Sequence, residues 1–510
     1  CALEKGGQWE KAMELFVFME DHHGVTPDVI SCSATISALG KAGQWEKALD
    51  IFNSMDPRGI RPNVITCNAV ISALGNGGQW EKAIEVFDSM GSRGIRQNVI
   101  SHSAVISACE KSGKWEKALE VFDSMEGRDF GPNTITFNTV ISALGKGGQW
   151  EKALDIFNSM EDRGVKPDVI SYNAAISACE RGLQWKRALE LLTVMVSRGV
   201  ESDVISFNAA ISACEKSGQW EKALKLFTLM GARGVKPDII SYNSAISACE
   251  KGGEWKKALE LFESVETHGI LLDVITYNAA ISALEKGGQW EKALQVFDSM
   301  DGRCIRPDVI TYSAVISALE KGGQWEKALE LFTLMQDHGI VPDVIICNAA
   351  ISALDKGGQW EKALEIFDFM SDQGLEPDVV SFSATIKVMD AASRFDEVES
   401  LMHEARQRGL YPKAFSSSSK VDLHDCTAAV ARAVMRVVLT ELQSGVREPC
   451  EIVVVTGRGN RSEGQAVLPG QVRNFLQEVS GPEVTEEPDN DGRFILRHDS
   501  VMNWLREGRV

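Results

Sequence analysis

The sequence predicts an all-α solenoid superhelix of 35-residue helical hairpins, followed by a small α/β sandwich domain. The first observation is a tryptophan-centred segment, usually Trp-Glu-Lys-Ala, that recurs every 35 residues over most of the chain. The second is that apolar residues within each copy follow the period of an α-helix. The third is that the repeats stop near residue 413, after which strand-like and helix-like segments alternate. A fixed period of this size is the signature of a solenoid.

The repeating unit is clearest in residues 274–308, VITYNAAISALEKGGQWEKALQVFDSMDGRCIRPD. We number its positions from place 1 at Val274 to place 35 at Asp308. Place 17 is Trp290 in this unit, and Phe395 holds the same place in the last unit. The other units carry Trp45, Trp80, Trp115, Trp150, Trp185, Trp220, Trp255, Trp325 and Trp360 there.

Each unit is predicted to be a pair of helices. Apolar residues recur at i, i+3, i+4 and i+7 between about Thr276 and Lys286, which places them on one face of helix A. Two glycines then allow a sharp turn. Helix B begins at Trp290, and the loop after it ends at Pro307, which disfavours helix. One hairpin cannot bury both apolar stripes alone, so we expect stacked hairpins with the A helices on the inner, concave surface.

The chain is predicted to contain four segments. Residues 1–28 are a truncated first repeat, because the chain opens inside a unit, and we expect the true N-terminus and any targeting peptide to lie upstream. Residues 29–413 are an array of about 11 repeats, of which the last is degenerate. Residues 414–420 are a short Ser-rich linker that we expect to be flexible. Residues 421–510 are a separate α/β domain.

Composition limits the class of protein. With 44% hydrophobic and 25% charged residues, the chain is expected to be soluble and ordered. No apolar run approaches the roughly 18 residues that a membrane span needs, so no membrane association is expected. Cysteines recur at places 4 and 11 of helix A. Equivalent cysteines in stacked copies indicate buried, reduced thiols in preference to a metal or disulfide framework.

The net charge of −19 is unusual for a nucleic-acid binder, which is normally basic. Residues 1–413 carry 42 basic and 58 acidic residues, a net charge of −16. Most of these acids, such as Glu291 and Asp298, are predicted on helix B and away from the inner surface, so their position matters more than the total. A protein-binding helical-repeat scaffold is the alternative that the acidic total favours.

Four places form regular rows along the predicted inner surface. Place 2 is always branched and apolar, place 5 is only Asn or Ser, place 13 is basic in nine of ten units, and place 35 is Asp or Asn from Asn63 to Asp378. Lysines at a regular pitch suit a phosphate backbone, and short amides, hydroxyls and carboxylates can bind a base edge. Helix capping at place 5 and turn formation at place 35 are the structural alternatives. These alternatives do not predict the joint pattern.

The segments VITYNAAISAL, KGGQWEKALQVFDSM and IRPD resemble the pentatricopeptide repeat, and the resemblance covers about residues 1–413. The tetratricopeptide class differs in its period of 34 and its tryptophan signature. The resemblance implies modular binding of single-stranded RNA, with one base per repeat held between place 2 side chains. The edge of each base would be bound by places 5 and 35.

The family's pairing rule implies a base for each repeat. It implies A for Ser33 with Asn63, a pyrimidine for Asn68 with Asn98, A for Ser103 with Asn133, U for Asn138 with Asp168, Asn173 with Asp203, Asn208 with Asp238, Asn243 with Asp273 and Asn278 with Asp308, G for Ser313 with Asp343, and U for Asn348 with Asp378. Ser383 with Lys413 carries no clear preference. The implied target is 5′-AYAUUUUUGU-3′. The lysines expected to hold its phosphates are Lys111, Lys146, Lys216, Lys251, Lys286, Lys321 and Lys356.

The C-terminal segment is predicted to alternate strands and helices. The strands are expected at residues 421–424, 452–455 and 494–497, and the helices at residues 427–442 and 469–479, with an acidic loop at residues 483–491. The residues Val-Asp-Leu-His at 421–424 and Thr-Gly-Arg-Gly at 456–459 resemble the two motifs of the Smr domain. That resemblance implies nucleic-acid binding, endonuclease activity in some members, and an organellar protein, with the chloroplast favoured over the mitochondrion. Asp425 departs from the glycine that commonly follows the histidine.

The Smr-like residues could support RNA cleavage. His424 could act as general base or acid, with Asp422 orienting it or holding a divalent metal, the one cofactor we consider. The amides of Gly457 and Gly459, beside Thr456 and Arg458, could bind a phosphate. A histidine at a strand end is also often simply hydrogen-bonded, so an RNA clamp without cleavage is the alternative.

Overall fold

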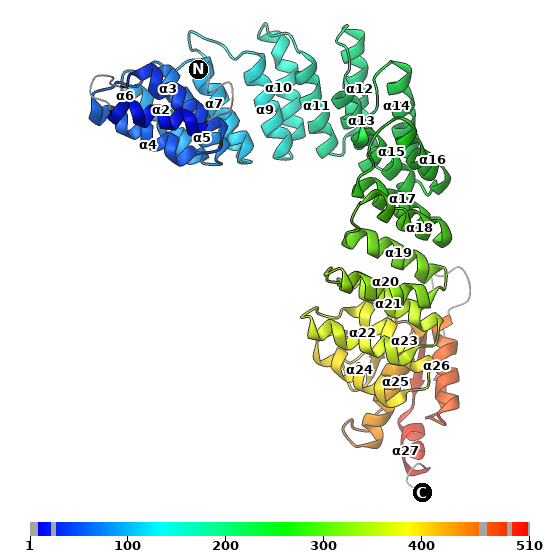
Figure 1. The fold of residues 1–510 in the computed structure, drawn as a ribbon. Helices are drawn as coiled ribbons and strands as arrows, with labels where there is room; N and C mark the ends of the chain where they lie inside the picture. Colours follow the sequence, from blue (N-terminus) through cyan, green and yellow to red (C-terminus); the bar gives the residue numbers. More distant parts are fainter. Residues whose placement is uncertain (1–8, 22–26, 458–466, 487–491, 508–510) are drawn as a thin grey trace. The chain divides into compact units, whose positions relative to one another are not determined.

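The computed structural model describes the chain except for residues 1–8, 22–26, 458–466, 487–491 and 508–510. It contains two compact units, residues 1–271 and residues 272–510 (Figure 1). Both consist of helical hairpins, and the second also contains a small sheet. This arrangement confirms the predicted all-helical solenoid for the repeats. Among the described helices, none has the length and apolar character needed to cross a bilayer.

The A helices are 13 residues long and begin at place 1 of each repeat. In the first unit they are α3 (Val29–Lys41), α5 (Val64–Asn76), α7 (Val99–Lys111), α9 (Thr134–Lys146), α11 (Val169–Arg181), α13 (Val204–Lys216) and α15 (Ile239–Lys251). In the second unit they are α17 (Val274–Lys286), α19 (Val309–Lys321), α21 (Val344–Lys356) and α23 (Val379–Ala391). Helix A therefore starts two residues before the predicted start at Thr276, because Asp273 caps it.

The B helices begin at place 17, as predicted. In the first unit they are α2 (Trp9–Asp21), α4 (Trp45–Met55), α6 (Trp80–Ser92), α8 (Trp115–Asp123), α10 (Trp150–Asp162), α12 (Trp185–Ser197), α14 (Trp220–Ala232) and α16 (Trp255–Thr267). In the second unit they are α18 (Trp290–Asp298), α20 (Trp325–Asp337), α22 (Trp360–Asp372) and α24 (Phe395–Gln407). Short 3₁₀ turns, η1 (Asp56–Arg58) and η2 (Asp301–Arg303), follow α4 and α18.

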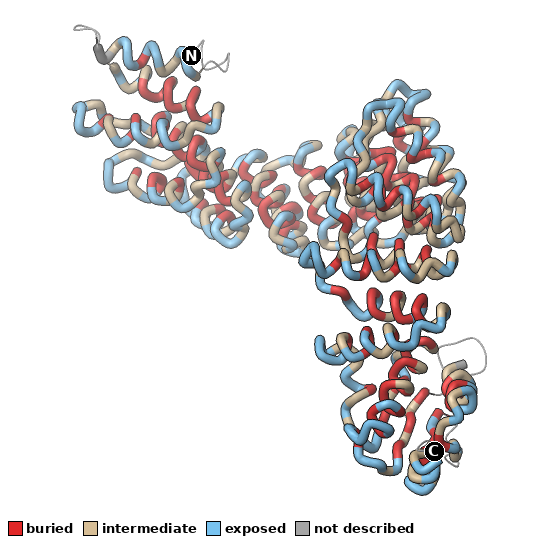
Figure 2. The backbone as a smooth tube through the Cα atoms, turned by 60° about the horizontal axis from the view of Figure 1, so that its bottom comes forward, coloured by how far each residue is buried: buried red, intermediate tan, exposed pale blue. Residues whose placement is uncertain are grey.

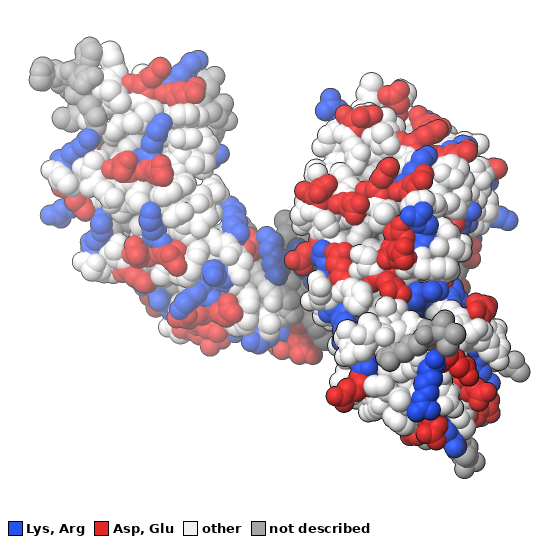
Figure 3. Space-filling model, turned by 90° about the horizontal axis from the view of Figure 1, so that it is seen from below, with Lys and Arg blue, Asp and Glu red and all other residues white. Residues whose placement is uncertain are grey.

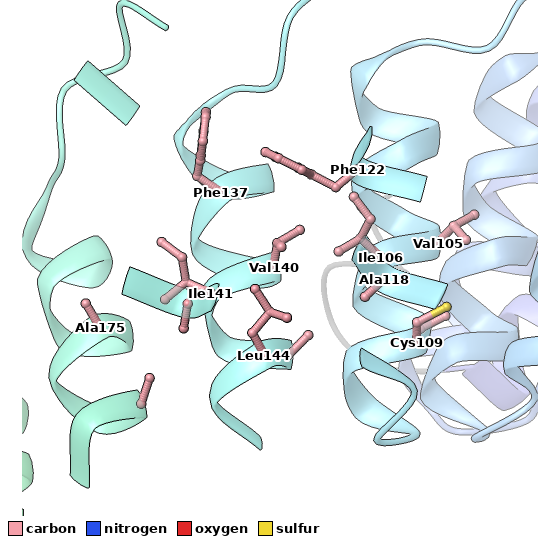
Figure 4. Packing of buried hydrophobic residues seen from close by; sticks show 14 of the residues in the cluster. Val105, Ile106, Cys109, Ala118, Phe122, Phe137, Val140, Ile141, Leu144 and Ala175 are labelled. Atoms are coloured by element: carbon pink, nitrogen blue, oxygen red, sulfur yellow. The ribbon is translucent and has the colours of Figure 1, made fainter. Parts of the chain in front are cut away.

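Each hairpin completes its core against the next one. Within each unit, successive A helices pack on one another, and each B helix packs on its own A helix and on the following one. The buried positions form stripes along the facing sides of these helices (Figure 2). Figure 4 shows Phe122 of α8 and Phe137 of α9 pointing toward one another, with their ring centroids 5.2 Å apart in an edge-to-face arrangement. The apolar faces predicted from the period are therefore the faces that pack.

The repeated cysteines lie in this core, as predicted. The place 11 thiols are fully buried and carry no disulfide. Burial raises the pKa of each to about 11. These are Cys109, Cys179, Cys214 and Cys249. They act as small apolar side chains, because a thiol with so high a pKa is a poor nucleophile and a poor metal ligand.

The C-terminal region contains a mixed four-stranded sheet of order β1-β2-β4-β3. Strand β1 (Lys420–Asp422) pairs in parallel with β2 (Ile452–Val455), and β4 (Arg493–Leu496) is antiparallel to both β2 and β3 (Val484–Glu486). The helices are α25 (Ala428–Gln443), α26 (Val467–Glu478) and α27 (His498–Glu507). Sequence analysis found β2 with its bounds but missed β3, which lies in the segment expected to be an acidic loop, and α27.

This small domain packs directly on the last hairpin. Helix α25 contacts both α23 and α24, as each A helix contacts the hairpin before it. The Nε atom of Arg432 lies 2.9 Å from Asp390 Oδ2, and the guanidinium of Arg436 stacks 3.8 Å from the ring centroid of Phe395. The carbonyl oxygen of Ser418 accepts a hydrogen bond from Arg447. The Ser-rich segment is thus held against the domain and is not a free tether.

Candidate nucleic-acid interface

The place 2 side chains form an exposed aliphatic row. They are 57–67% exposed in every repeat, whereas Tyr277 and Ile281 on the opposite face of helix A are fully buried. The row consists of Ile30, Ile65, Ile100, Ile135, Ile170, Ile205, Ile240, Ile275, Ile310, Ile345 and Val380. Core packing does not require a branched apolar residue at an exposed place, so its recurrence indicates a contact surface.

Place 35 is the N-cap of the next A helix. The Asp168 carboxylate accepts hydrogen bonds from the backbone N–H of Ser171 (2.8 Å) and from its hydroxyl (2.9 Å). The caps of the other described A helices likewise accept from the backbone N–H of the place 3 residue. Such a cap satisfies backbone donors that have no partner within the helix. Place 35 thus has a structural role, but it is helix capping and not the turn formation that the structural alternative gave for this place. Place 5 lies inside helix A and is not a cap.

The side chains at places 5 and 35 are hydrogen-bonded in each repeat that has Asn at place 5 and Asp at place 35 within one compact unit. The Asn208 amide nitrogen donates to Asp238 Oδ1 at 2.9 Å. The other bonds are Asn138 to Asp168 (3.1 Å), Asn173 to Asp203 (3.1 Å), Asn278 to Asp308 (3.1 Å) and Asn348 to Asp378 (3.3 Å). Asn243 and Asp273 belong to the same repeat but lie in different compact units, residues 1–271 and residues 272–510. The residues paired by the family's rule thus touch one another in five repeats.

The amide oxygens of the place 5 asparagines differ in their hydrogen bonds from repeat to repeat. Asn173 Oδ1 accepts from the Ser206 hydroxyl at 2.5 Å, and Asn278 Oδ1 accepts from the Thr311 hydroxyl at 2.6 Å. The Oδ1 atoms of Asn68, Asn138 and Asn348 are buried and have no hydrogen-bond partner among the described residues. A buried acceptor without a donor is costly. These oxygens therefore mark places where a ligand N–H group would be stabilising.

Where place 5 is serine, the pair is arranged differently. The Ser33 hydroxyl lies 2.7 Å from the Thr66 hydroxyl, and the Ser103 hydroxyl lies 2.8 Å from the Thr136 hydroxyl. Both contacts are to place 3 of the next helix, and the caps at Asn63 and Asn133 bond to the same threonines. The shorter serine leaves more room at the surface than asparagine does.

A pocket of about 330 Å³ shows how these places combine. Ile170 and Ile205, two successive place 2 residues, line it together with the Asn173–Asp203 pair. Arg181 at place 13 also lines it. Two aliphatic side chains beside a hydrogen-bonding edge and a cation form a slot suited to a planar base and its phosphate.

The phosphate-binding role expected of the place 13 lysines stays a prediction, but the structure shows carboxylates beside several of them. The place 13 side chains are exposed, but five of them pair with a carboxylate at place 12 of the preceding repeat. These pairs are Lys146 with Glu110 (2.5 Å), Lys216 with Glu180 (2.8 Å), Lys251 with Glu215 (2.6 Å), Lys321 with Glu285 (2.5 Å) and Lys356 with Glu320 (3.0 Å). Figure 3 shows basic and acidic side chains interspersed on one face of the molecule. Sequence analysis missed the acidic row, because each pair spans adjacent repeats.

The Smr-like residues form a compact polar cluster at the end of β1. His424 Nδ1 lies 2.5 Å from Asp422 Oδ1, and His424 Nε2 lies 3.0 Å from Asp425 Oδ2. Lys413, the place 35 residue of the last repeat, lies 2.9 Å from Asp425 and 3.4 Å from His424 Nε2. Burial raises the pKa of Asp422, but the hydrogen bonds from His424 outweigh it, and the net pKa is lowered. Sequence analysis did not assign Lys413 or Asp425 to this site.

The second Smr-like motif is described only in part. The backbone N–H groups of Thr456 and Gly457 donate to the Gly492 carbonyl at 2.9 and 3.2 Å, so the Gly457 amide is engaged at the sheet edge. Arg458 and Gly459 lie outside the described residues. Within the described ranges, no three His, Cys, Asp or Glu side chains converge on a point that could hold a metal ion. We therefore assign no step to the divalent metal that the sequence suggested.

Comparisons with known proteins agree with the repeat architecture. The profile of the PPR repeat family matches residues 27–68, 62–111, 97–146, 132–181, 167–214, 202–251, 237–284, 272–321, 307–345 and 342–389. The chain therefore belongs to the PPR repeat family. No curated protein matches the chain.

Three solved structures resemble the chain at low sequence identity, and the first of them shares its fold. The pentatricopeptide repeat protein PPR10 from maize is 20% identical with a TM-score of 0.55, and the match covers 94% of this chain and 80% of that chain. PPR10 in complex with an 18-nt psaJ RNA element is 20% identical with a TM-score of 0.45, covering 94% and 82%. The PPR domain of Arabidopsis thaliana protein-only RNase P 1 in complex with tRNA is 16% identical with a TM-score of 0.32, covering 37% and 95%.

The caps predict a pH dependence of stability. Burial raises the pKa of Asp168, Asp238 and Asp378, but hydrogen bonds from the capped helix and from the place 5 asparagine outweigh it, so each pKa is lowered. The unfolded chain then binds more protons than the folded one at acid pH. The stability that these caps give should be complete above about pH 4, the unfolded pKa of Asp, and lost as pH falls through the folded pKa.

The measurement is the free energy of unfolding in urea, followed by circular dichroism, at pH values from about 2.5 to about 7. The triple variant Asp168→Asn, Asp238→Asn, Asp378→Asn keeps the capping geometry, as Asn63 and Asn98 do in the native chain. It should show a weaker loss of stability in acid than the wild type. An unchanged acid dependence in the triple variant would contradict this account of the caps.

Proposed function

We propose that this protein binds single-stranded RNA along its A helices, with one nucleotide per repeat and the target 5′-AYAUUUUUGU-3′. The observation that carries the proposal is the slot between Ile170 and Ile205, with the Asn173–Asp203 pair at its edge. The faces of a base are apolar and its edge is polar, so stacking against aliphatic groups and hydrogen bonding at the edge are complementary. The same places recur in every repeat at a constant sequence spacing.

The preference for uracil is argued from the orientation of the place 5 amide at Asn138 and Asn348, because the amide oxygens of Asn173, Asn208 and Asn278 already accept from the place 3 hydroxyl of the next helix. An aspartate cap only accepts hydrogen bonds, so the amide nitrogen of Asn138 must face Asp168, and the amide oxygen must face the other way. That oxygen is buried without a donor. The edge of uracil has one N–H donor between two carbonyl acceptors, and this donor can satisfy it. Cytosine offers an acceptor at the same position and would not.

The pyrimidine expected at Asn68 has the same physical origin. Its cap, Asn98, keeps its Oδ1 on Ser101 and makes no hydrogen bond to Asn68 among the described residues, so it does not fix the orientation of the Asn68 amide. A free amide can present its nitrogen to cytosine or its oxygen to uracil. A less selective site is the result.

The test is the affinity of the protein for the ten-nucleotide RNA 5′-AUAUUUUUGU-3′. Fluorescence anisotropy should show binding at least about tenfold tighter than to the complement 5′-ACAAAAAUAU-3′, because several base contacts are lost in the complement. Equal affinity for the two RNAs would exclude the assigned sequence. If neither RNA binds, the acidic surface belongs to a protein-binding scaffold.

The C-terminal domain is proposed to clamp the RNA beyond the last repeat. Lys413 ends the repeat array and also lies against the His424 cluster, so a strand leaving the last repeat would meet this cluster. Cleavage is the second candidate, and the short contact between Asp422 and His424 favours it. Asp425 opposes it, because its carboxylate faces His424 Nε2, the atom that would take a proton from a ribose hydroxyl.

The two candidates differ in one variant. The RNA 5′-AUAUUUUUGU-3′ with a five-nucleotide 3′ extension is incubated with the wild type and with His424→Ala. A clamp predicts no fragments from either protein and weaker binding of the extended RNA by His424→Ala, with unchanged binding of the ten-nucleotide RNA. Fragments that form with the wild type and disappear with His424→Ala would establish cleavage instead.

A further inference from the structure

The residue at place 12, the last but one of helix A, divides the repeats into two kinds. It is glycine at Gly40, Gly75 and Gly145 and acidic in the other units. The acidic residues are Glu110, Glu180, Glu215, Glu250, Glu285, Glu320, Asp355 and Asp390. This difference controls which cations at place 13 can take part in binding.

An acidic place 12 holds the next place 13 lysine. Glu110 Oε1 accepts from Lys146 Nζ at 2.5 Å and from the Ser142 hydroxyl at 2.9 Å. The five bridging glutamate side chains are 11–20% exposed, while their lysine partners are 39–48% exposed. A carboxylate so deeply placed needs its cation, because losing one partner of such a pair leaves a charge without compensation.

A glycine at place 12 excludes this bridge. A Cβ atom on Gly145 would lie 3.0 Å from the Cβ of Ala178, so the two A helices approach too closely for a larger residue. Arg181, the next place 13 residue, has no carboxylate partner in the described part of the chain and lines the pocket between Ile170 and Ile205. Lys111 follows Gly75 in the same way, and its Nζ donates to the neutral Asn76 Oδ1 at 2.6 Å.

We propose that Lys111 and Arg181 bind the RNA phosphates, whereas the place 13 lysines behind an acidic place 12 are bridges between repeats that contribute little to RNA affinity. This inference rests on the proposed RNA binding and assigns the backbone contacts within it. A phosphate that binds Lys146 competes with Glu110 for the ammonium group. The free energy gained from the phosphate contact is offset by the cost of leaving the Glu110 carboxylate without its cation. A phosphate approaching Arg181 displaces only solvent and counterions, which is the source of salt-dependent affinity.

The first arm of the test releases three bridged lysines. The triple variant Glu110→Gln, Glu180→Gln, Glu215→Gln frees Lys146, Lys216 and Lys251 and keeps an oxygen for the serine contacts. The association constant K for 5′-AUAUUUUUGU-3′ is measured at KCl concentrations from about 50 to about 300 mM. The slope of log K against log salt should steepen by about 2, since each phosphate contact to a single strand contributes about 0.7.

The matched control is Glu81→Gln, Glu151→Gln, Glu221→Gln. These glutamates are exposed in the first turn of B helices and change the net charge equally. The control should leave the slope nearly unchanged. If the control and the bridge variant steepen the slope equally, only total charge matters, and the inference is overturned.

The second arm removes cations in pairs. Lys111→Gln with Arg181→Gln should flatten the slope by about 1.4, which corresponds to two lost phosphate contacts. Lys146→Gln with Lys216→Gln should leave the slope unchanged and lower the urea midpoint, because Glu110 and Glu180 lose their partners. An equal flattening by both pairs would refute the assignment. A wild type that binds no RNA would instead refute the proposed function.

Discussion

The structure depends on the hydrogen bonds made by the place 35 side chain. The same carboxylate starts helix A by capping its first turn and fixes the amide of the place 5 asparagine beside it. In the proposed function, the same group therefore serves both the fold and the choice of base. Both Asp and Asn cap the helix at this place, and we propose that the choice between them changes what the neighbouring amide can present.

The repeat architecture could be predicted from local physics, and the contacts between repeats could not. The 35-residue period, the apolar stripes and the Gly-Gly turn each act within one hairpin, so their consequences follow from the sequence of that hairpin. The bridge from Glu110 to Lys146 depends on the register of two stacked helices, which no single repeat contains. The same reason hides the contact of α25 with the last hairpin, since it joins the repeat array to a segment that does not follow the repeat.

The candidate site shows the same division. The exposure of the place 2 residues and the proximity of places 5 and 35 agree with what the joint pattern suggested. Sequence analysis did not assign Asp425 and Lys413 to the site. Lys413 contacts His424 only because the end of the repeat array lies against the small domain, which the sequence does not show. The acidic total of the chain is also partly explained, since many carboxylates serve as structural partners of the lysines on the A helices.

The measurement that tests the central claim most directly is a change of base preference in a designed pair of substitutions. The variant Asn173→Ser, Asn208→Ser keeps both aspartate caps and replaces two amides with hydroxyls, as in the native Ser313–Asp343 pair. Selection of RNA from a pool randomised at the fifth and sixth nucleotides should return U at both positions for the wild type and G at both for the variant. Selection of U by both proteins would show that places 5 and 35 do not determine the base.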